Sequence, residues 1–209
     1  MNAAPASGSD RGSSARDHIL EAAALAFAEH GYHGLSMRRL AKVANRSPAS
    51  FYNHFESKED LLFCLQRDAF TDLLKSARDS VAKATKPREK LCAFVDNHVR
   101  YFAEHRSLMR VLVHEAGTLP SERRAPIRLL KEQYFALARS LVSQHIEETD
   151  PRELERITYG IFGMLNWMYA WYEPAHHGCV EELSLTLQRQ VLGAVGPSKD
   201  RRLRTTGCL

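Results

Sequence analysis

Residues 36–58 read SMRRLAKVANRSPASFYNHFESK and contain two short helix patterns separated by a turn. Ser36 is a residue type that caps helix N-termini, and apolar residues recur on one side of the segment that follows it. Asn45 lies in the turn, where asparagine tolerates the left-handed conformation better than most residues. Ser47 caps the next helix, and Pro48 occupies its first position, where a missing N–H costs nothing. Two short helices joined by such a turn are typical of a helix-turn-helix.

The segments on both sides also carry helix patterns. Ser14 with Asp17 resembles a capping box, and the helix that it starts ends at Gly31, a residue that accepts a positive φ. Ser57 with Asp60 starts a long helix. Further helices are predicted from Pro87, over Leu108–His114, over 127–146, from Asp150 to about Tyr172, and through Leu183–Leu192, with 119–126 as a loop or as a helix that begins at Ser121. We find no useful strand alternation and no internal repeat, so the predicted fold is all-α.

Composition places the chain among ordinary globular proteins. It has 209 residues, of which 44% are hydrophobic and 26% charged. No apolar run approaches the roughly 18 residues that a membrane-spanning helix needs. The first 14 residues are polar and rich in Ala, Ser and Gly, and lack the apolar core of a signal peptide. We therefore expect a cytoplasmic protein without a membrane partner. The predicted domains are a disordered tail at 1–14, a helix-turn-helix domain at 15–60, a second helical domain at 61–195 and a tail at 196–209.

Positive charge is concentrated in one segment. Residues 36–58 hold five basic residues and one acidic residue, whereas the rest of the chain is balanced with 24 of each sign. Such a compact basic segment in a balanced chain is typical of an electrostatic footprint for phosphate, although an ordinary solvated face would have the same composition.

The helix-turn-helix pattern assigns a DNA-contact role to individual residues. The N-terminal end of the second helix lies near base edges in such motifs, so Pro48, Ala49 and Ser50 are the expected base-reading residues. Cations and helix-capping serines nearby are expected to contact phosphates, which position a protein more than they specify sequence. The predicted DNA-binding residues are Ser36, Arg38, Arg46, Ser47, Pro48, Ala49, Ser50, Tyr52, Asn53, His54 and Lys58. Packing by Tyr52, an ordinary surface position for His54 and simple capping by Ser36 are the alternatives.

The same segment resembles a known family. Ile19–Ala23, then Phe27, Glu29, Gly31 and Tyr32, then Ser36–Ala41, Ser47 and Ser50–Glu59 are similar, in a fixed register, to the DNA-binding domain of the TetR/AcrR family. The resemblance implies a homodimeric regulator of about nine helices that binds double-stranded, palindromic operator DNA. It also implies an N-terminal three-helix helix-turn-helix domain and a C-terminal helical domain for ligand binding and dimerisation.

The sequence departs from the family pattern at the turn. The family usually has Ala-Gly-Val-Ser, where this chain has Ala44–Asn45–Arg46–Ser47, and Ala49 stands where glycine is frequent. Arg46 replaces an apolar residue that normally packs, so its side chain must either extend to solvent or add a phosphate contact. These differences concern the operator sequence more than the fold.

The C-terminal half carries a second resemblance, limited to one helix and the loop after it. Gly160–Tyr172 is similar to the penultimate helix of regulators of fatty-acid and steroid breakdown, which implies a small hydrophobic or amphipathic effector of the acyl-CoA class. The predicted effector-binding residues are Phe94, His98, Phe102, Met109, Tyr134, Leu137, Asn166, Trp167 and Tyr169. The predicted dimer-interface residues are Gly160, Gly163, Leu183, Leu187 and Val191. Each of these is also explained by packing within one chain.

Other functional classes lack support in the sequence. No Gly-rich phosphate loop, GxSxG or HExxH occurs, so we expect neither an enzyme nor a cofactor. The four cysteines, Cys64, Cys92, Cys179 and Cys208, form no CxxC pair, so buried reduced thiols are expected rather than a metal site or disulfides. The remaining alternative is a DNA-binding regulator or activator that needs no ligand.

Overall fold

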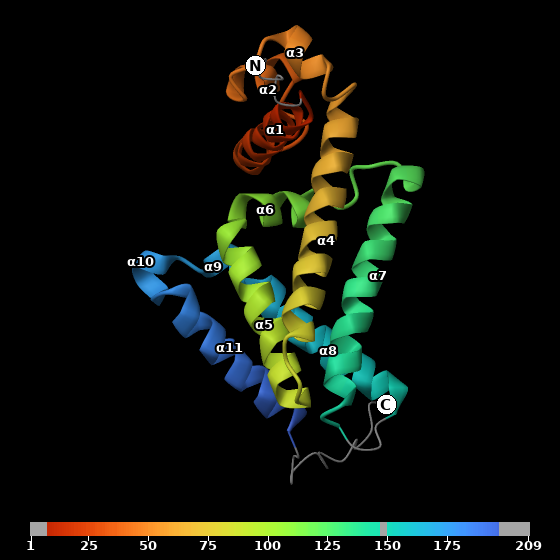
Figure 1. The fold of residues 1–209 in the computed structure, drawn as a ribbon, viewed down its shortest axis with the longest axis vertical. Coiled ribbons are helices and arrows are strands. Elements are labelled where there is room, and N and C mark those ends of the chain that lie inside the picture. Colours follow the sequence, from red (N-terminus) through yellow and green to blue (C-terminus); the bar gives the residue numbers. More distant parts are fainter. Residues whose placement is uncertain (1–7, 147–149, 197–209) are drawn as a thin grey trace, which may run out of the picture. The chain divides into compact units, whose positions relative to one another are not determined.

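The computed structural model describes residues 8–146 and 150–196, and all regular secondary structure in these ranges is helical (Figure 1). The helices are α1 (Gly8–His30), α2 (Met37–Val43), α3 (Pro48–Tyr52), α4 (Lys58–Ala82), α5 (Pro87–Glu104), α6 (Arg106–His114), α7 (Ser121–Ser143), α8 (Pro151–Asn166), α9 (Met168–Trp171), α10 (Pro174–His177) and α11 (Val180–Val195). The all-α prediction is confirmed. The short helices α9 and α10 take the number beyond the expected nine or so.

The chain divides into two compact units. The first unit combines the described residues up to 71 with 105–130, and the second combines 72–104 with the described residues from 131 onward. In the first unit, α1 packs on α2 and α6, and α2 packs on α3. In the second, α5 packs on α8 and α11. The boundaries between units fall within α4 and α7. The functional division at residue 60, by contrast, stays a prediction.

Local capping explains where several helices begin. The side-chain oxygens of Ser36, Ser47 and Ser57 accept hydrogen bonds from the backbone N–H three residues later, at 3.0–3.3 Å. Asp150 caps α8 in the same manner by accepting from Arg152 N at 3.0 Å. Gly31, after the end of α1, has a φ of 71° and donates to Phe27 O at 2.9 Å. These sequence predictions are confirmed, because each depends on contacts between residues close in the chain.

Other boundaries differ from the predictions. Helix α1 begins at Gly8 rather than Ser14, so the prediction of a disordered tail is wrong for residues 8–14. Extending an existing helix adds one hydrogen bond for each residue that is fixed, so an N-terminal extension costs little. The predicted helix to Tyr172 ends at Asn166, a residue type that competes for backbone hydrogen bonds and favours helix ends. Helix α7 begins at Ser121, and the predicted C-terminal tail from residue 197 lies outside the described residues.

Candidate functional site

The α2–turn–α3 segment has the geometry of a helix-turn-helix. Asn45 adopts a φ of 52°, as expected of the turn residue. Its neighbour Arg46 donates its backbone N–H to Ala41 O at 2.9 Å, which closes the turn. Ser47 caps α3 and Pro48 follows at the first helical position. The turn therefore depends on a left-handed residue where the family pattern has glycine, and asparagine supplies it.

The two helices bury one face and expose the other. Leu40 and Ala41 of α2 and Phe51 of α3 are at most 1% exposed, and Phe51 packs near Phe55 with ring centroids 6.2 Å apart. Burial of these side chains holds α3 in place on its apolar side. Val43, which the pattern placed on that side, is instead 48% exposed.

The predicted DNA-binding residues lie mostly on the exposed side of this segment. Ser36, Arg38, Arg46, Ser47, Pro48, Ala49, Tyr52 and Asn53 are exposed, and Ser50, His54 and Lys58 are half-buried. Tyr52 is 48% exposed, although Phe51 beside it is buried. A large aromatic side chain that stays in solvent on a five-residue helix is not needed for the core of this chain. This favours an external partner for it over the packing alternative.

Lys58, at the start of α4, is already engaged within the unit. Its Nζ donates to Tyr32 O and Leu35 O, both at 2.8 Å, and lies 4.2 Å from the centre of the Tyr32 ring. These contacts fix the segment between α1 and α2 to the first turn of α4. A phosphate contact by the Lys58 side chain stays a prediction, and its ammonium would have to share its donors with these two carbonyls.

The Lys58→Met substitution is expected to destabilise the protein by about 1.5–3 kcal/mol, the range for hydrogen bonds to a charged group. Methionine preserves the length of the apolar stem but leaves two backbone carbonyls without their donor. Chemical denaturation followed by circular dichroism measures the free energy of unfolding. Lys42→Met is the control, since Lys42 is exposed. Equal stability of Lys58→Met and wild type would contradict this role.

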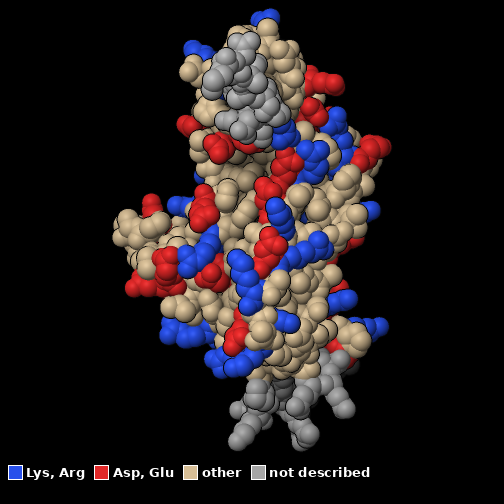
Figure 2. Space-filling model, viewed as in Figure 1, with Lys and Arg blue, Asp and Glu red and all other residues tan. Residues whose placement is uncertain are grey.

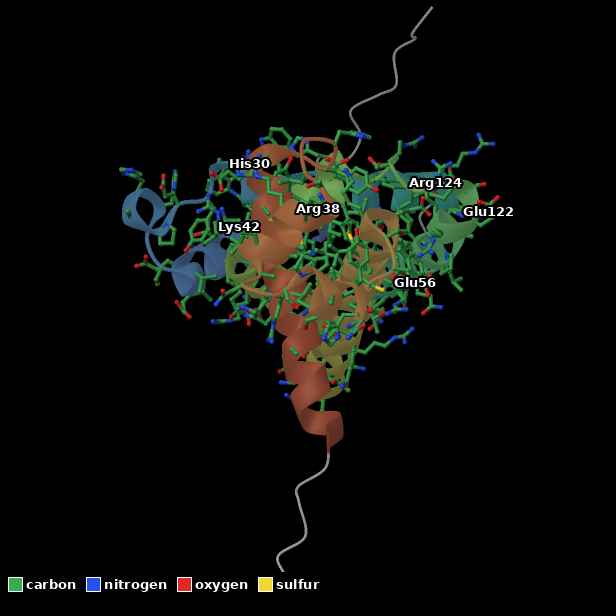
Figure 3. The ribbon with its side chains drawn as sticks, turned by 90° about the horizontal axis from the view of Figure 1, so that it is seen from above. His30, Arg38, Lys42, Glu56, Glu122 and Arg124 are labelled. Atoms are coloured by element: carbon green, nitrogen blue, oxygen red, sulfur yellow. The ribbon has the colours of Figure 1, made fainter. Side chains whose placement is uncertain are left out.

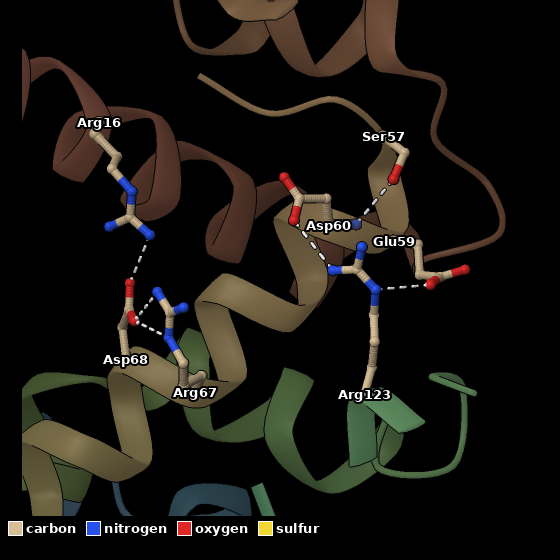
Figure 4. Close-up of polar contacts among 7 residues, drawn as sticks. All are labelled: Arg16, Ser57, Glu59, Asp60, Arg67, Asp68 and Arg123. Atoms are coloured by element: carbon tan, nitrogen blue, oxygen red, sulfur yellow. Dashed lines mark hydrogen bonds and ion pairs between the residues drawn. The ribbon is translucent and has the colours of Figure 1, made fainter. Parts of the chain in front are cut away.

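Ion pairs and hydrogen bonds link this segment to α6 and α7 within the first unit (Figure 4). Arg123 of α7 pairs with Glu59 and Asp60 of α4, each at 3.1 Å. Tyr32 N donates to Glu115 Oε1 at 3.1 Å, and the buried Gln66 donates to Glu115 O at 3.1 Å. Sequence reasoning missed these residues because the partners lie far apart in the chain.

The second unit contains a cluster of aromatic rings around one polar pair. His98 Nδ1 and Tyr134 Oη are 3.0 Å apart, and both side chains are buried. The His98 ring stacks on Phe102 with centroids 4.0 Å apart. Phe94 lies 5.0 Å from Tyr134, and Phe162 lies 6.1 Å from His98. The structure therefore brings together four predicted effector residues, Phe94, His98, Phe102 and Tyr134, and adds Phe162, which was not predicted.

His98 is neutral in this environment. Burial lowers the pKa of the imidazole to about 3, against a smaller opposing effect of the Leu165 backbone. The second ring nitrogen, Nε2, is buried and has no hydrogen-bond partner of acceptable geometry among the described residues. A buried nitrogen without a partner is unfavourable in water-free surroundings, so it is a ready site for a polar group of a ligand.

The depressed pKa of His98 predicts an acid-dependent loss of stability. An unfolded imidazole titrates near 6.5. Below that pH the unfolded chain therefore binds a proton that the folded chain does not, and stability is lost as the pH falls toward 3. Compared with His98→Phe, wild type should lose about 1.4 kcal/mol for each pH unit between about 6.5 and 4. Denaturation at several pH values measures this slope. His176→Phe, at an exposed position, should leave the wild-type slope unchanged.

The other predicted effector residues do not join this cluster as a group. Tyr169 is buried, Leu137 is half-buried, and Met109 is buried in the first unit rather than the second. Asn166 is exposed and Trp167 is 61% exposed. The prediction that these two face the interior is wrong, because α8 ends at Asn166 and the chain changes direction before α9.

A surface groove on the second unit contains most of the predicted dimer residues. Its volume is about 380 Å³, and it is lined by Gly163, Met164, Trp167, Trp171, Leu183, Thr186, Leu187 and Gln190. Gly160 and Gly163 are exposed, with no atom within 4 Å of a Cβ built on either, so a second helix has room to approach. Val191 is 0% exposed and packs within the chain, so its assignment to an interface is wrong.

Two family models match the chain. Residues 19–64 match "Bacterial regulatory proteins, tetR family", and residues 84–188 match "Tetracyclin repressor-like, C-terminal domain". The chain belongs to the TetR family. It is therefore a transcriptional regulator with a DNA-binding helix-turn-helix rather than an enzyme. The first match contains the whole α2–turn–α3 segment, and the second contains the aromatic cluster of the second unit.

Named relatives of this TetR-family regulator include proteins of lipid metabolism. The repressor KstR2 of Mycobacterium tuberculosis is 27% identical over 186 residues, which cover 87% of this chain and 93% of KstR2. The fatty acid metabolism regulator protein of Bacillus subtilis is 24% identical over 135 residues, covering 65% and 70%. The structure of AibR in complex with isovaleryl coenzyme A and operator DNA is 25% identical, covers 88% of this chain and 100% of AibR, and has a TM-score of 0.75.

Searches for other kinds of site gave limited results. No group of three or more His, Cys, Asp or Glu side chains that could hold a metal ion occurs among the described residues. No helix in these residues is long and apolar enough to cross a membrane. Cys64 and Cys92 are half-buried, but Cys179 is exposed, so the expectation of buried thiols is wrong there, and Cys208 lies outside the described residues.

Proposed function

We propose that this TetR-family regulator is a homodimeric repressor that binds a palindromic operator and leaves it when a small amphipathic effector binds the second unit. The observation that carries the DNA-binding part is the exposed end of α3. Pro48, Ala49 and Tyr52 are exposed while Phe51 is buried, so the helix presents its outer face to solvent on a firm apolar base. Small residues at its start let the backbone approach base edges closely.

The groove on α8 and α11 supports the dimer. It is apolar for the most part, and two exposed tryptophans, Trp167 and Trp171, lie on it. Exposed aromatic side chains of this kind are enriched at the centres of protein interfaces. A second copy of the chain would place the same groove opposite itself in a two-fold, four-helix arrangement.

The aromatic cluster supports an effector site in the second unit. An apolar site with few polar groups suits an acyl chain with a polar head. His98 and Tyr134 supply those groups, and the unpartnered Nε2 of His98 is the expected contact for the effector. The similarity to AibR, whose structure contains isovaleryl coenzyme A, favours an acyl-CoA thioester. Effector binding is proposed to favour a dimer whose recognition helices no longer match major-groove faces about 34–36 Å apart.

A matched pair of ligands tests this proposal. DNA fragments selected by the wild-type protein are titrated with octanoyl-CoA and with its thioether analogue S-octyl-CoA, which lacks only the carbonyl oxygen. If Nε2 of His98 donates to that oxygen, octanoyl-CoA should release DNA at an about tenfold lower concentration than the thioether, the value of one net hydrogen bond. His98→Phe should abolish this difference. Failure of both ligands, and of isovaleryl-CoA, to release DNA would reject the acyl-CoA effector and favour the ligand-independent regulator or activator.

A further inference from the structure

A crevice at the helix-turn-helix is surrounded by cations. It has a volume of about 330 Å³ and lies between α2 and the start of α3. Arg38, Lys42 and Arg46 line it, together with the polar residues Asn45 and Ser47. All three cations are exposed, and Arg38 and Lys42 both come from α2, where Figure 3 labels them.

These three cations lack the partners that other cations of the unit have. Among the described residues, no ion pair or hydrogen bond of the side chains of Arg38, Lys42 or Arg46 is found. By contrast, Arg16, Arg67 and Arg123 pair with carboxylates of α4 (Figure 4). The face of the molecule in Figure 2 likewise shows Lys and Arg interspersed with Asp and Glu. The crevice is thus an exception to the charge pairing found elsewhere.

The arrangement of the cations does not help the fold. Arg38 and Lys42 are four residues apart on α2, where like charges repel. Arg38 also lies in the first turn of α2, which contains no acidic residue and where the helix dipole disfavours a cation. Helix stability alone therefore does not account for this cluster, which an anion would stabilise.

The turn directs Arg46 to this crevice. The left-handed Asn45 and the bond from Arg46 N to Ala41 O fix the backbone immediately before α3. Since the side chain is exposed, it does not replace the packing of the apolar residue expected there. A guanidinium at this place presents several donors in a fixed plane, the geometry that suits a phosphate.

We propose that Arg38, Lys42 and Arg46 form a phosphate site that binds a backbone phosphate of duplex DNA beside the base-reading end of α3. The proposal rests on the DNA binding proposed above. The site gives affinity that does not depend on base sequence, because phosphate contacts position a protein without reading bases. It assigns to Arg46, a departure from the family pattern, a contact that an apolar residue cannot make.

The salt dependence of binding tests the site without knowledge of the operator. The probe is a duplex of random sequence, and its affinity is measured at several salt concentrations for wild type, Arg46→Met and Arg124→Met. Arg124 is an exposed arginine of α7 in the same unit, so its substitution makes the same change in net charge. Methionine retains the apolar stem of arginine, and circular dichroism verifies folding.

Loss of one phosphate contact makes the slope of log K against log salt shallower by about 0.9 for each bound protomer. We expect this for Arg46→Met and not for Arg124→Met, with a further decrease for Lys42→Met/Arg46→Met. Equal slopes for wild type and Arg46→Met, or equal decreases for both single variants, would overturn the site while leaving DNA binding intact. Absence of wild-type binding at every salt concentration would overturn the proposed function as well.

A second titration separates DNA phosphate from free phosphate. Inorganic pyrophosphate is added at constant ionic strength, and its binding is measured by calorimetry. Arg46-dependent binding of pyrophosphate, with a duplex affinity that does not depend on Arg46, would assign the crevice to a soluble phosphate compound and overturn the DNA assignment. An Arg46-dependent duplex affinity supports it.

Discussion

The Ala49→Glu substitution is expected to lower operator affinity at least about 100-fold without unfolding the protein. Ala49 is exposed in the first turn of α3, where a carboxylate would face base acceptors and phosphates and would displace a close backbone approach. A single base contact provides about 1–3 kcal/mol, so losing one and adding repulsion exceeds the upper value. The helix itself should tolerate glutamate, because negative charge is favourable near a helix N-terminus.

Electrophoretic mobility shift on fragments selected by wild type measures this effect. Ala136→Glu is the matched control, since Ala136 is also exposed on a helix but lies in the second unit. Its affinity should stay within about threefold of wild type, because surface substitutions usually change little. Equal affinities of Ala49→Glu and wild type would remove α3 from the DNA interface.

The Trp167→Glu substitution is expected to convert the dimer to a monomer at micromolar concentration. Trp167 is 61% exposed in the single chain, so its replacement should not disturb the core. In a two-fold interface the change occurs twice, and each lost tryptophan anchor costs about 2 kcal/mol or more. The dissociation constant should therefore rise at least about 1,000-fold.

Sedimentation velocity measures the oligomeric state of Trp167→Glu, and operator affinity should fall with it because each half-site then binds alone. Leu129→Glu serves as the control, since Leu129 is 54% exposed on α7 and does not line the groove. A dimeric Trp167→Glu variant, or a monomeric Leu129→Glu variant, would place the interface elsewhere.

The helix-turn-helix could be predicted in detail because its determinants are local. The caps at Ser36 and Ser47 and the left-handed Asn45 each depend on neighbours within a few residues, and the structure has all of them. The sequence also indicated that Arg46 would extend to solvent if it did not pack, and it is exposed.

The tertiary contacts around the candidate sites could not be predicted in the same way. The ammonium of Lys58 binds carbonyls 23 and 26 residues earlier, and Arg123 binds carboxylates more than 60 residues away. The exposure of Asn166 follows from a helix end that neither glycine nor proline marks. Val191 has the same apolar spacing as Leu187, and only packing against other helices shows that it is fully buried.

Selection of genomic DNA fragments by the purified protein tests the central claim most directly. Wild type and Ala49→Glu are each incubated with fragments at two salt concentrations, and the bound fragments are sequenced. We predict that wild type enriches a palindrome, more weakly at the higher salt concentration, and that Ala49→Glu enriches none. Absence of an enriched sequence for wild type at both concentrations, or the same palindrome for both proteins, would contradict operator binding through α3.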